Sequence, residues 1–327
     1  MSSFSDPTII GLLQERFVPV ADNDWYNRRR EDAIGTFFRE MADQGPRKGE
    51  GGSTRQGHYI FTASGKLLGF NNHRAPDRRL AFIRDALAKW DALPPAEREP
   101  GPADPPPGPQ ADPRYAAAPP VGGLVLNSFT RTLKPDGDSP AGFTRCQDAD
   151  IDHPGGHFAA FDHVWIQADE WAALREIAES GGGDVPEPIA VRLLRFHLVD
   201  NTRGEPPFWE RDEIRDFRFE IQPTDEPRRF RLSGHALLAT SANPESADRG
   251  YDADLLGTVE ITEDGSPGRF DLVALGQHWG EGSYTLNARP GNSPLGIAFE
   301  LAARDQPSDE IRPQASGFLK GYWEAHR

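Results

Sequence analysis

The sequence predicts an α/β unit to about residue 93 and a mainly antiparallel, β-rich unit with two helices from residue 121, joined by a proline-rich linker. Three observations lead to this prediction. A hairpin pattern and a helix pattern follow one another in residues 57–93, prolines crowd residues 94–120, and apolar residues alternate with polar ones from Asp216 onward. A chain of 327 residues is long enough for two domains that each bury a core.

The first unit, residues 1–93, opens with helical patterns. Asp6 can cap a helix whose first position is Pro7. Residues 17–20 then read as a short buried strand. A second helix is expected from Trp25, with an apolar stripe that ends before Gly45.

A hairpin followed by a helix completes the first unit. His58–Phe61 and Leu67–Phe70 are apolar runs separated by a turn-forming Ala-Ser-Gly-Lys, so we expect two paired strands. Pro76 suits the first turn of a helix, and apolar residues recur on one helical face until Pro94 and Pro95 forbid its continuation.

Two segments of this unit resemble a known family. Phe4-Ser5-Asp6-Pro7 through Phe17-Val18-Pro19-Val20, together with the run Tyr-Ile-Phe-Thr-Ala-Ser-Gly-Lys-Leu-Leu-Gly at residues 59–69, resembles the thioredoxin-like fold over about residues 4–93. The resemblance implies a Cys-x-x-Cys pair at the start of the first helix and a Thr-Pro with a cis proline before the third strand.

Neither half of that redox site is present. The chain has Thr54-Arg55-Gln56-Gly57 where Thr-Pro is expected, and Cys146 is its only cysteine. An intrachain disulfide is therefore excluded, and the family's redox activity does not carry over. Two interpretations follow: the unit binds and scaffolds, or the native chain starts upstream with the cysteines and is a thiol oxidoreductase.

In the second unit, residues 121–327, the sequence predicts a sheet with helices near 169–180 and 188–199. Leu124–Leu133 alternates as a strand requires, and Gly181-Gly182-Gly183 closes the first helix. Inward-facing apolar positions then recur at every second residue in the later strands, namely Phe217, Phe219, Ile221, Phe230, Leu232, Val259, Ile261, Phe270, Leu272, Ile297, Phe299 and Leu301.

The net charge of -15 argues against nucleic acid and anionic membrane as partners, because both require a cationic surface. No apolar run approaches the roughly 20 residues of a bilayer span, and the first residues lack the features of a signal peptide. We therefore expect a cytoplasmic protein as written, exported only if an N-terminal segment is missing.

A histidine-rich loop is the first candidate for chemistry. Cys146, His153, His157 and His163 supply the thiolate and imidazole ligands that zinc or another transition metal prefers. The spacing matches no metal signature, so an acidic, solvated loop is the competing interpretation.

Two further segments predict a ligand site. The end of the second helix and the loop after it can hold a carboxylate or transfer a proton, although a structural ion pair explains the same residues. A glycine-rich loop after residue 275 offers hydrogen bonds and a flat aromatic surface, and an ordinary tight loop has the same composition. The candidates are His197, Asp200, Arg203, Glu205 and Trp209 in the first segment and His278, Trp279, Glu281 and Tyr284 in the second.

The first functional hypothesis is a noncatalytic binding or scaffold protein whose β-rich unit binds a protein or a small molecule. The alternative is a metal-binding protein or metal-dependent enzyme that uses the histidine loop with His197 or His278. No nucleotide or flavin motif is present, and the sequence leaves open whether the protein is an enzyme.

Overall fold

The computed structural model describes residues 6–20, 24–49, 53–73, 75–99, 118–139, 142–147, 150 and 159–327. The chain divides into two compact units, Met1–Ala117 and Ala118–Arg327. The boundary falls inside the segment predicted as a linker.

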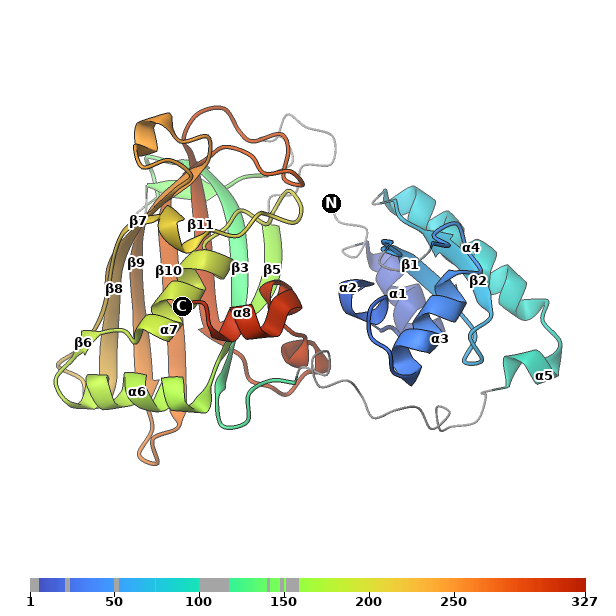
Figure 1. Cartoon of the computed structure of the whole chain (residues 1–327), viewed down its shortest axis with the longest axis horizontal. Helices are drawn as coiled ribbons and strands as arrows, with labels where there is room; N and C mark the ends of the chain where they lie inside the picture. The colour runs from blue at the N-terminus through green and yellow to red at the C-terminus, as the bar shows by residue number, and fades with distance from the viewer. Residues whose placement is uncertain are drawn as a thin grey trace. The chain divides into compact units, whose positions relative to one another are not determined.

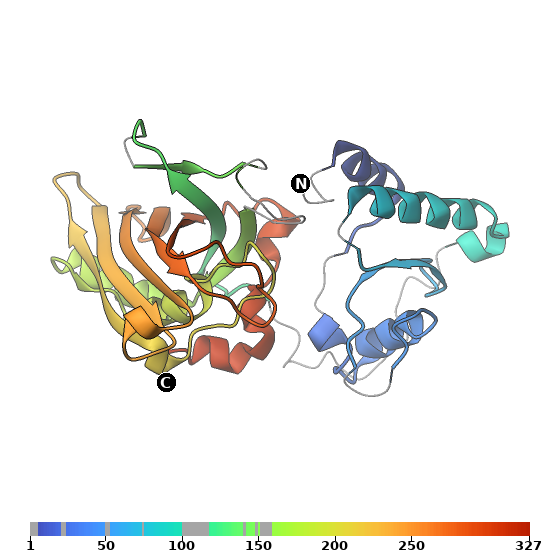
Figure 2. The same cartoon turned by 90° about the horizontal axis from the view of Figure 1, so that it is seen from above.

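The first unit has a two-stranded antiparallel sheet between helices (Figures 1 and 2). The Phe37 ring of α3 meets the Phe61 ring of β1 in an edge-to-face contact, while Gly69 of β2 lies against Phe82 of α4, so the hairpin carries a helix on each face. The elements are α1 (Pro7–Arg16), α2 (Asp24–Asn27), α3 (Ala33–Ala42), β1 (His58–Phe61), β2 (Leu67–Asn71), α4 (Pro76–Asp91) and α5 (Pro95–Arg98).

The hairpin and the helices that begin at Pro7 and Pro76 are confirmed, and the Asp6 carboxylate accepts hydrogen bonds from the N–H groups of Thr8 and Ile9. The strand predicted at residues 17–20 is wrong. Val18 and Val20 are 90% and 77% exposed, and no strand in the described ranges pairs with them. Pro19 between them lacks the N–H that such pairing would use.

The helix expected from Trp25 is interrupted, because Asp32 starts a new helix. Its carboxylate bonds the N–H of Gly35 as an N-cap and the guanidinium of Arg30 at 2.9 Å, which ends α2 and begins α3. With β1 and β2 as the strands of this unit in the described ranges, the thioredoxin-like fold is not confirmed.

The second unit is built on one large antiparallel sheet, as the alternating pattern predicted. The strand order is β4-β3-β11-β10-β9-β8-β7-β6, and β5 pairs with β3 beside β4. The strands are β3 (Leu124–Pro135), β4 (Phe143–Arg145), β5 (Ala159–Ile166), β6 (Gly183–Asp184), β7 (Ile214–Pro223), β8 (Arg229–Ala239), β9 (Gly250–Ile261), β10 (Pro267–Trp279) and β11 (Ser293–Leu301).

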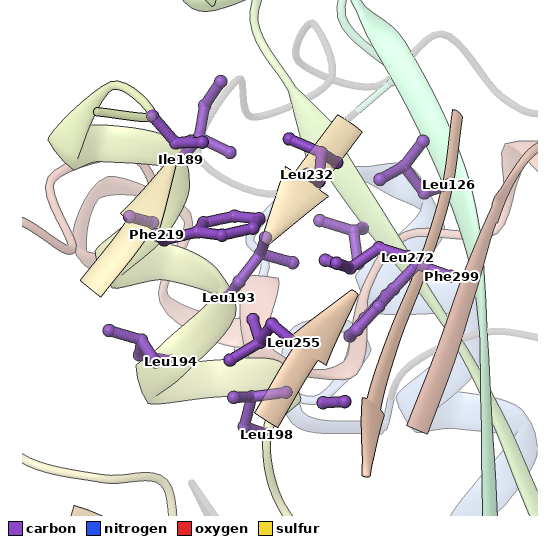
Figure 3. Packing of buried hydrophobic residues seen from close by; sticks show 14 of the residues in the cluster. Leu126, Ile189, Leu193, Leu194, Leu198, Phe219, Leu232, Leu255, Leu272 and Phe299 are labelled. Carbon is purple, nitrogen blue, oxygen red and sulfur yellow. The ribbon is translucent and has the colours of Figure 1, made fainter. Parts of the chain in front are cut away.

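The sheet is a curved wall, and helices cover its inner face (Figures 1 and 2). They are α6 (Ala168–Glu179) and α7 (Glu187–Arg192), the latter continued by a π-helical segment, η3 (Leu193–His197). Figure 3 shows Leu193 and Leu198 of this segment beside Leu255 of the sheet, and all three belong to the buried core. Burial of these apolar side chains, each worth about 1.5–3 kcal/mol, holds the helices on the sheet.

The C-terminal helix α8 (Leu319–Trp323) covers the edge strand β5. The Tyr322 hydroxyl accepts the backbone N–H of Trp165, and the Trp165 and Trp323 rings stack at 6.1 Å. From the other side, the buried Arg192 guanidinium donates to the carbonyls of Tyr322 and Trp323. An unpaired sheet edge is thereby protected.

Candidate functional site

The two segments predicted to bind a ligand meet at one end of the sheet, the upper end in Figure 1. The loop after η3 contributes Asp200 and Arg203, and the loop after β10 contributes backbone carbonyls. Arg203 Nε donates to Asp200 Oδ2 at 2.8 Å, Nη2 donates to the Gly280 carbonyl at 3.0 Å, and Nη1 donates to the Thr285 carbonyl. Arg203 therefore ties both loops together.

Two glycines permit this close approach. A Cβ on Gly204 would lie 2.2 Å from the Tyr284 carbonyl oxygen, and a Cβ on Gly280 would lie 1.9 Å from that of Asp248. Gly280 also has φ of +86°, where side chains are strained. Glycine at these positions places the loops over the end of the sheet.

His278 lies beneath these loops, on the inner face of β10. It pairs across the sheet with Tyr251 of β9 and Ser293 of β11, and 6% of its surface is exposed. The imidazole has no hydrogen-bond partner among the residues the structure describes. Burial lowers its pKa to about 4, and the nearby Asp200 carboxylate only partly opposes this, so the ring is neutral at neutral pH.

Arg289 and Cys146 flank the same end of the sheet. The Arg289 guanidinium donates to the carbonyl of Leu133 on β3 at 2.5 Å and to that of Pro294 on β11 at 2.6 Å. Its Nη1 also lies 3.9 Å from the Sγ of Cys146, a buried free thiol that follows β4. We call Asp200, Arg203, His278 and Arg289 the sheet-end site.

The inward-facing side chains of β3 change from apolar to hydroxyl-bearing as the strand approaches this site. Its inward positions read Leu124 and Leu126 over the apolar core, then Ser128, Thr130 and Thr132, all buried. Hydroxyl groups replace aliphatic side chains only where the strand approaches the sheet-end site. The inner surface therefore offers hydrogen-bonding groups at one end and an apolar core at the other.

Two predicted ligand residues belong to the framework. His197 is buried in η3, where its Nε2 lies 3.0 Å from the Tyr322 hydroxyl and its Nδ1 lies 3.7 Å from Asp162 Oδ2. Burial lowers the pKa of His197 to about 3. Trp209 is fully buried and donates to the Leu198 carbonyl at 2.8 Å.

The other predicted ligand residues lie around the rim. Glu205 is exposed, and Tyr284 is 75% exposed. Trp279 points to the outer face and donates to the Ala247 carbonyl at 3.0 Å, while Glu281 accepts the N–H of Ala288 at 2.7 Å. Of the nine predicted residues, Asp200, Arg203 and His278 come together in the site.

The metal prediction is only partly within the described chain. His153 and His157 lie outside the described residues. Cys146 lies beside Arg289, whereas His163 sits on the outer face of β5 against Phe161. In the ranges that are described, no group of three histidine, cysteine or acidic side chains is arranged to hold a metal ion. A metal site that includes the two remaining histidines stays a prediction.

Sequence reasoning missed Arg289, Arg249 and the β3 hydroxyls. The signal for the hydroxyls was present, because Ser128, Thr130 and Thr132 share one parity in a strand that begins with leucines on that face. Arg289 stands alone in an Asn-Ala-Arg-Pro-Gly loop, and nothing in its local sequence indicates the contacts it makes with β3 and β11.

Comparison with protein-family models, curated proteins and solved structures finds no match to this chain. None of the helices in the described ranges combines the length and apolarity needed to cross a membrane.

Proposed function

We propose that residues 118–327 form a noncatalytic ligand-binding unit and that its ligand occupies the sheet-end site. The observation that carries the proposal is the His278 imidazole, which is 6% exposed and has no hydrogen-bond partner in the described part of the chain. Neither ring nitrogen is among the fully buried atoms that lack a hydrogen-bond partner, so solvent reaches the polar edge of the ring. A ligand that enters the site would therefore meet an imidazole whose hydrogen-bonding groups are not used by the described protein.

The neighbouring groups favour binding over catalysis. The Asp200 carboxylate accepts from the Thr202 hydroxyl at 2.6 Å, from the Thr202 N–H at 3.0 Å and from Arg203. Burial alone would raise the pKa of Asp200, but the charge of Arg203 and the hydrogen bonds from Thr202 and Arg203 hold it below its usual range. A carboxylate bonded in this way is committed to holding the loop rather than to exchanging protons with a substrate.

We propose that the first unit acts as a scaffold or partner-binding module. The thioredoxin-like assignment, and the thiol chemistry that upstream cysteines would supply, remain predictions. Sequencing the DNA upstream of Met1 for an in-frame Cys-x-x-Cys tests them.

A thermal-shift screen of the full-length protein against a library of small molecules tests the ligand-binding proposal. Three proteins are compared: wild type, His278→Gln, and His235→Gln as the matched control. His235 lies on the outer face of β8, 3.1 Å from Asp254, and takes no part in the site.

We expect compounds that raise the melting temperature of wild type and of the control but not of His278→Gln. Ligand saturation at about 100 times Kd adds about 2.7 kcal/mol of stability, which a thermal shift resolves. Compounds that stabilise all three proteins equally would place binding elsewhere and contradict the proposal.

A further inference from the structure

The sheet-end site has a charge pattern that identifies a class of ligand. We infer that it takes an oxyanion, the carboxylate or phosphate group of a small molecule, which Arg289 and His278 bind together. The inference rests on the ligand-binding function proposed above and adds the chemistry of the ligand.

Three guanidinium groups act on His278 through their charge. Those of Arg203, Arg249 and Arg289 act to lower the pKa of its imidazole, and the Asp200 carboxylate acts to raise it. Arg249 projects from the start of β9, where it lies 3.8 Å over the Trp209 ring and 3.8 Å from Glu213. The cations come from three separate segments of the chain. Arg289 is anchored beside the ring, because it donates to the carbonyl of Pro294 and the preceding residue, Ser293, pairs with His278 across the sheet.

No carboxylate among the described residues contacts the Arg289 guanidinium, and Asp200, whose charge acts on it, is already bonded to Arg203. Arg203 is bonded to Asp200, and Arg249 lies near Glu213, but Arg289 is bonded to two carbonyl oxygens and a thiol. Burial lowers the pKa of Arg289 from its ordinary value, yet a guanidinium stays charged in proteins. A partly buried charge that only neutral groups contact favours an anion beside it.

The second unit as a whole is acidic, in contrast to the three arginines near His278. Residues 118–327 contain 35 acidic and 20 basic side chains, so they account for the acidity of the whole chain. The unit therefore has many carboxylates that could pair with Arg289. Among the described side chains, none of them contacts it. Free hydrogens on the Arg289 Nε and on the His278 ring supply the donors that an oxyanion requires.

Protonation of His278 is coupled to binding. The charged groups that face the ring are Asp200 and Arg203 from the loop after η3, Arg249 at the start of β9, and Arg289. The Tyr251 hydroxyl is bonded to the carbonyls of Ala274 and Leu295, and burial raises its pKa, so it stays neutral. An added anion offsets the three cations and favours the imidazolium, which then donates to the anion. Binding should strengthen as the pH falls.

Histidine NMR on the full-length protein tests the inference. Ring-labelled protein is titrated with inorganic phosphate, with acetate and with neutral acetamide, at a series of pH values from about 4 to about 8. The His278 resonance is assigned from its loss in His278→Gln. The same titrations are made on Arg289→Gln, on Arg289→Lys and on Arg231→Gln, an exposed arginine on the outer face of β8 that serves as the matched control.

We expect phosphate or acetate to move the His278 resonance and raise its pKa by about one unit or more, and acetamide to leave both unchanged. Arg289→Gln should weaken binding about tenfold or more, Arg289→Lys should weaken it less because the charge remains, and Arg231→Gln should bind as wild type.

Three results would overturn the inference. If acetamide moves the His278 resonance as acetate does, the site binds ligands without regard to their charge. The anion inference would then be wrong, and the proposed ligand-binding function would stand. Anion binding that Arg289→Gln leaves unaffected would place the anion elsewhere. No response to phosphate or acetate, alongside neutral compounds that stabilise wild type but not His278→Gln in the thermal screen, would reject the anion and keep the binding function.

Discussion

The buried ion pair between Arg192 and Glu170 should control how firmly the C-terminal helix is held. The two side chains are 1% and 7% exposed, and two parallel hydrogen bonds of 2.6 Å join them. Arg192 also bonds the carbonyls of Trp165, Tyr322 and Trp323. The pair therefore joins α6 and α7 to the end of the chain.

Glu170→Gln keeps the shape of the side chain and removes its charge, which leaves the Arg192 charge buried without a counterion. Breaking a buried pair in this way costs about 3–5 kcal/mol. A loss of about 3 kcal/mol corresponds to about a hundredfold larger population of the open state. Urea unfolding followed by tryptophan fluorescence measures the global loss, and hydrogen exchange in residues 319–327 measures the local one.

The double variant Arg192→Met, Glu170→Leu is the control, because it removes both charges. It should be more stable than Glu170→Gln, since apolar replacements of a whole buried pair are often neutral. A loss below about 1 kcal/mol in Glu170→Gln, a value typical of exposed pairs, would refute the reasoning.

Two further predictions concern the core and the pH dependence of stability. Leu272→Ala on β10, where the side chain is 1% exposed, should lower the free energy of unfolding by about 2–5 kcal/mol in urea titrations, and a loss under about 1 kcal/mol would mean that the core there is not closed. The pKa of His278 falls from 6.5 in the unfolded chain to about 4 in the folded one, so the unfolded state binds the proton more tightly and stability should fall as the pH drops between these values, by about 3 kcal/mol in all. His278→Gln should flatten that decline, and an unchanged slope would contradict the assignment of His278 as a buried neutral ring.

Local patterns predicted much of the fold. The hairpin at residues 58–71, the helix that begins at Pro76 and the alternation of Phe270 and Leu272 are set by neighbours along the chain, so they could be inferred from spacing alone. The pattern at residues 17–20 misled, because an apolar run becomes a strand only when another strand pairs with it, and no strand of the described segments does.

The site was only partly predictable. His278, Asp200 and Arg203 stood out because polar residues cluster with glycines in loops. His278, however, lies inside β10, which continues to Trp279, and not in the loop expected after residue 275. The contacts of Arg289 depend on the order β3-β11-β10, which local spacing does not contain.

The most direct test of the central claim is the pH titration of the His278 ring resonance in the ligand-free, full-length protein. The ring sits buried and without a hydrogen-bond partner in the described chain, so its pKa should lie well below 6.5, near about 4. A pKa close to 6.5 would mean that water reaches the ring freely, and the sheet-end site would then have no buried group for a ligand to satisfy.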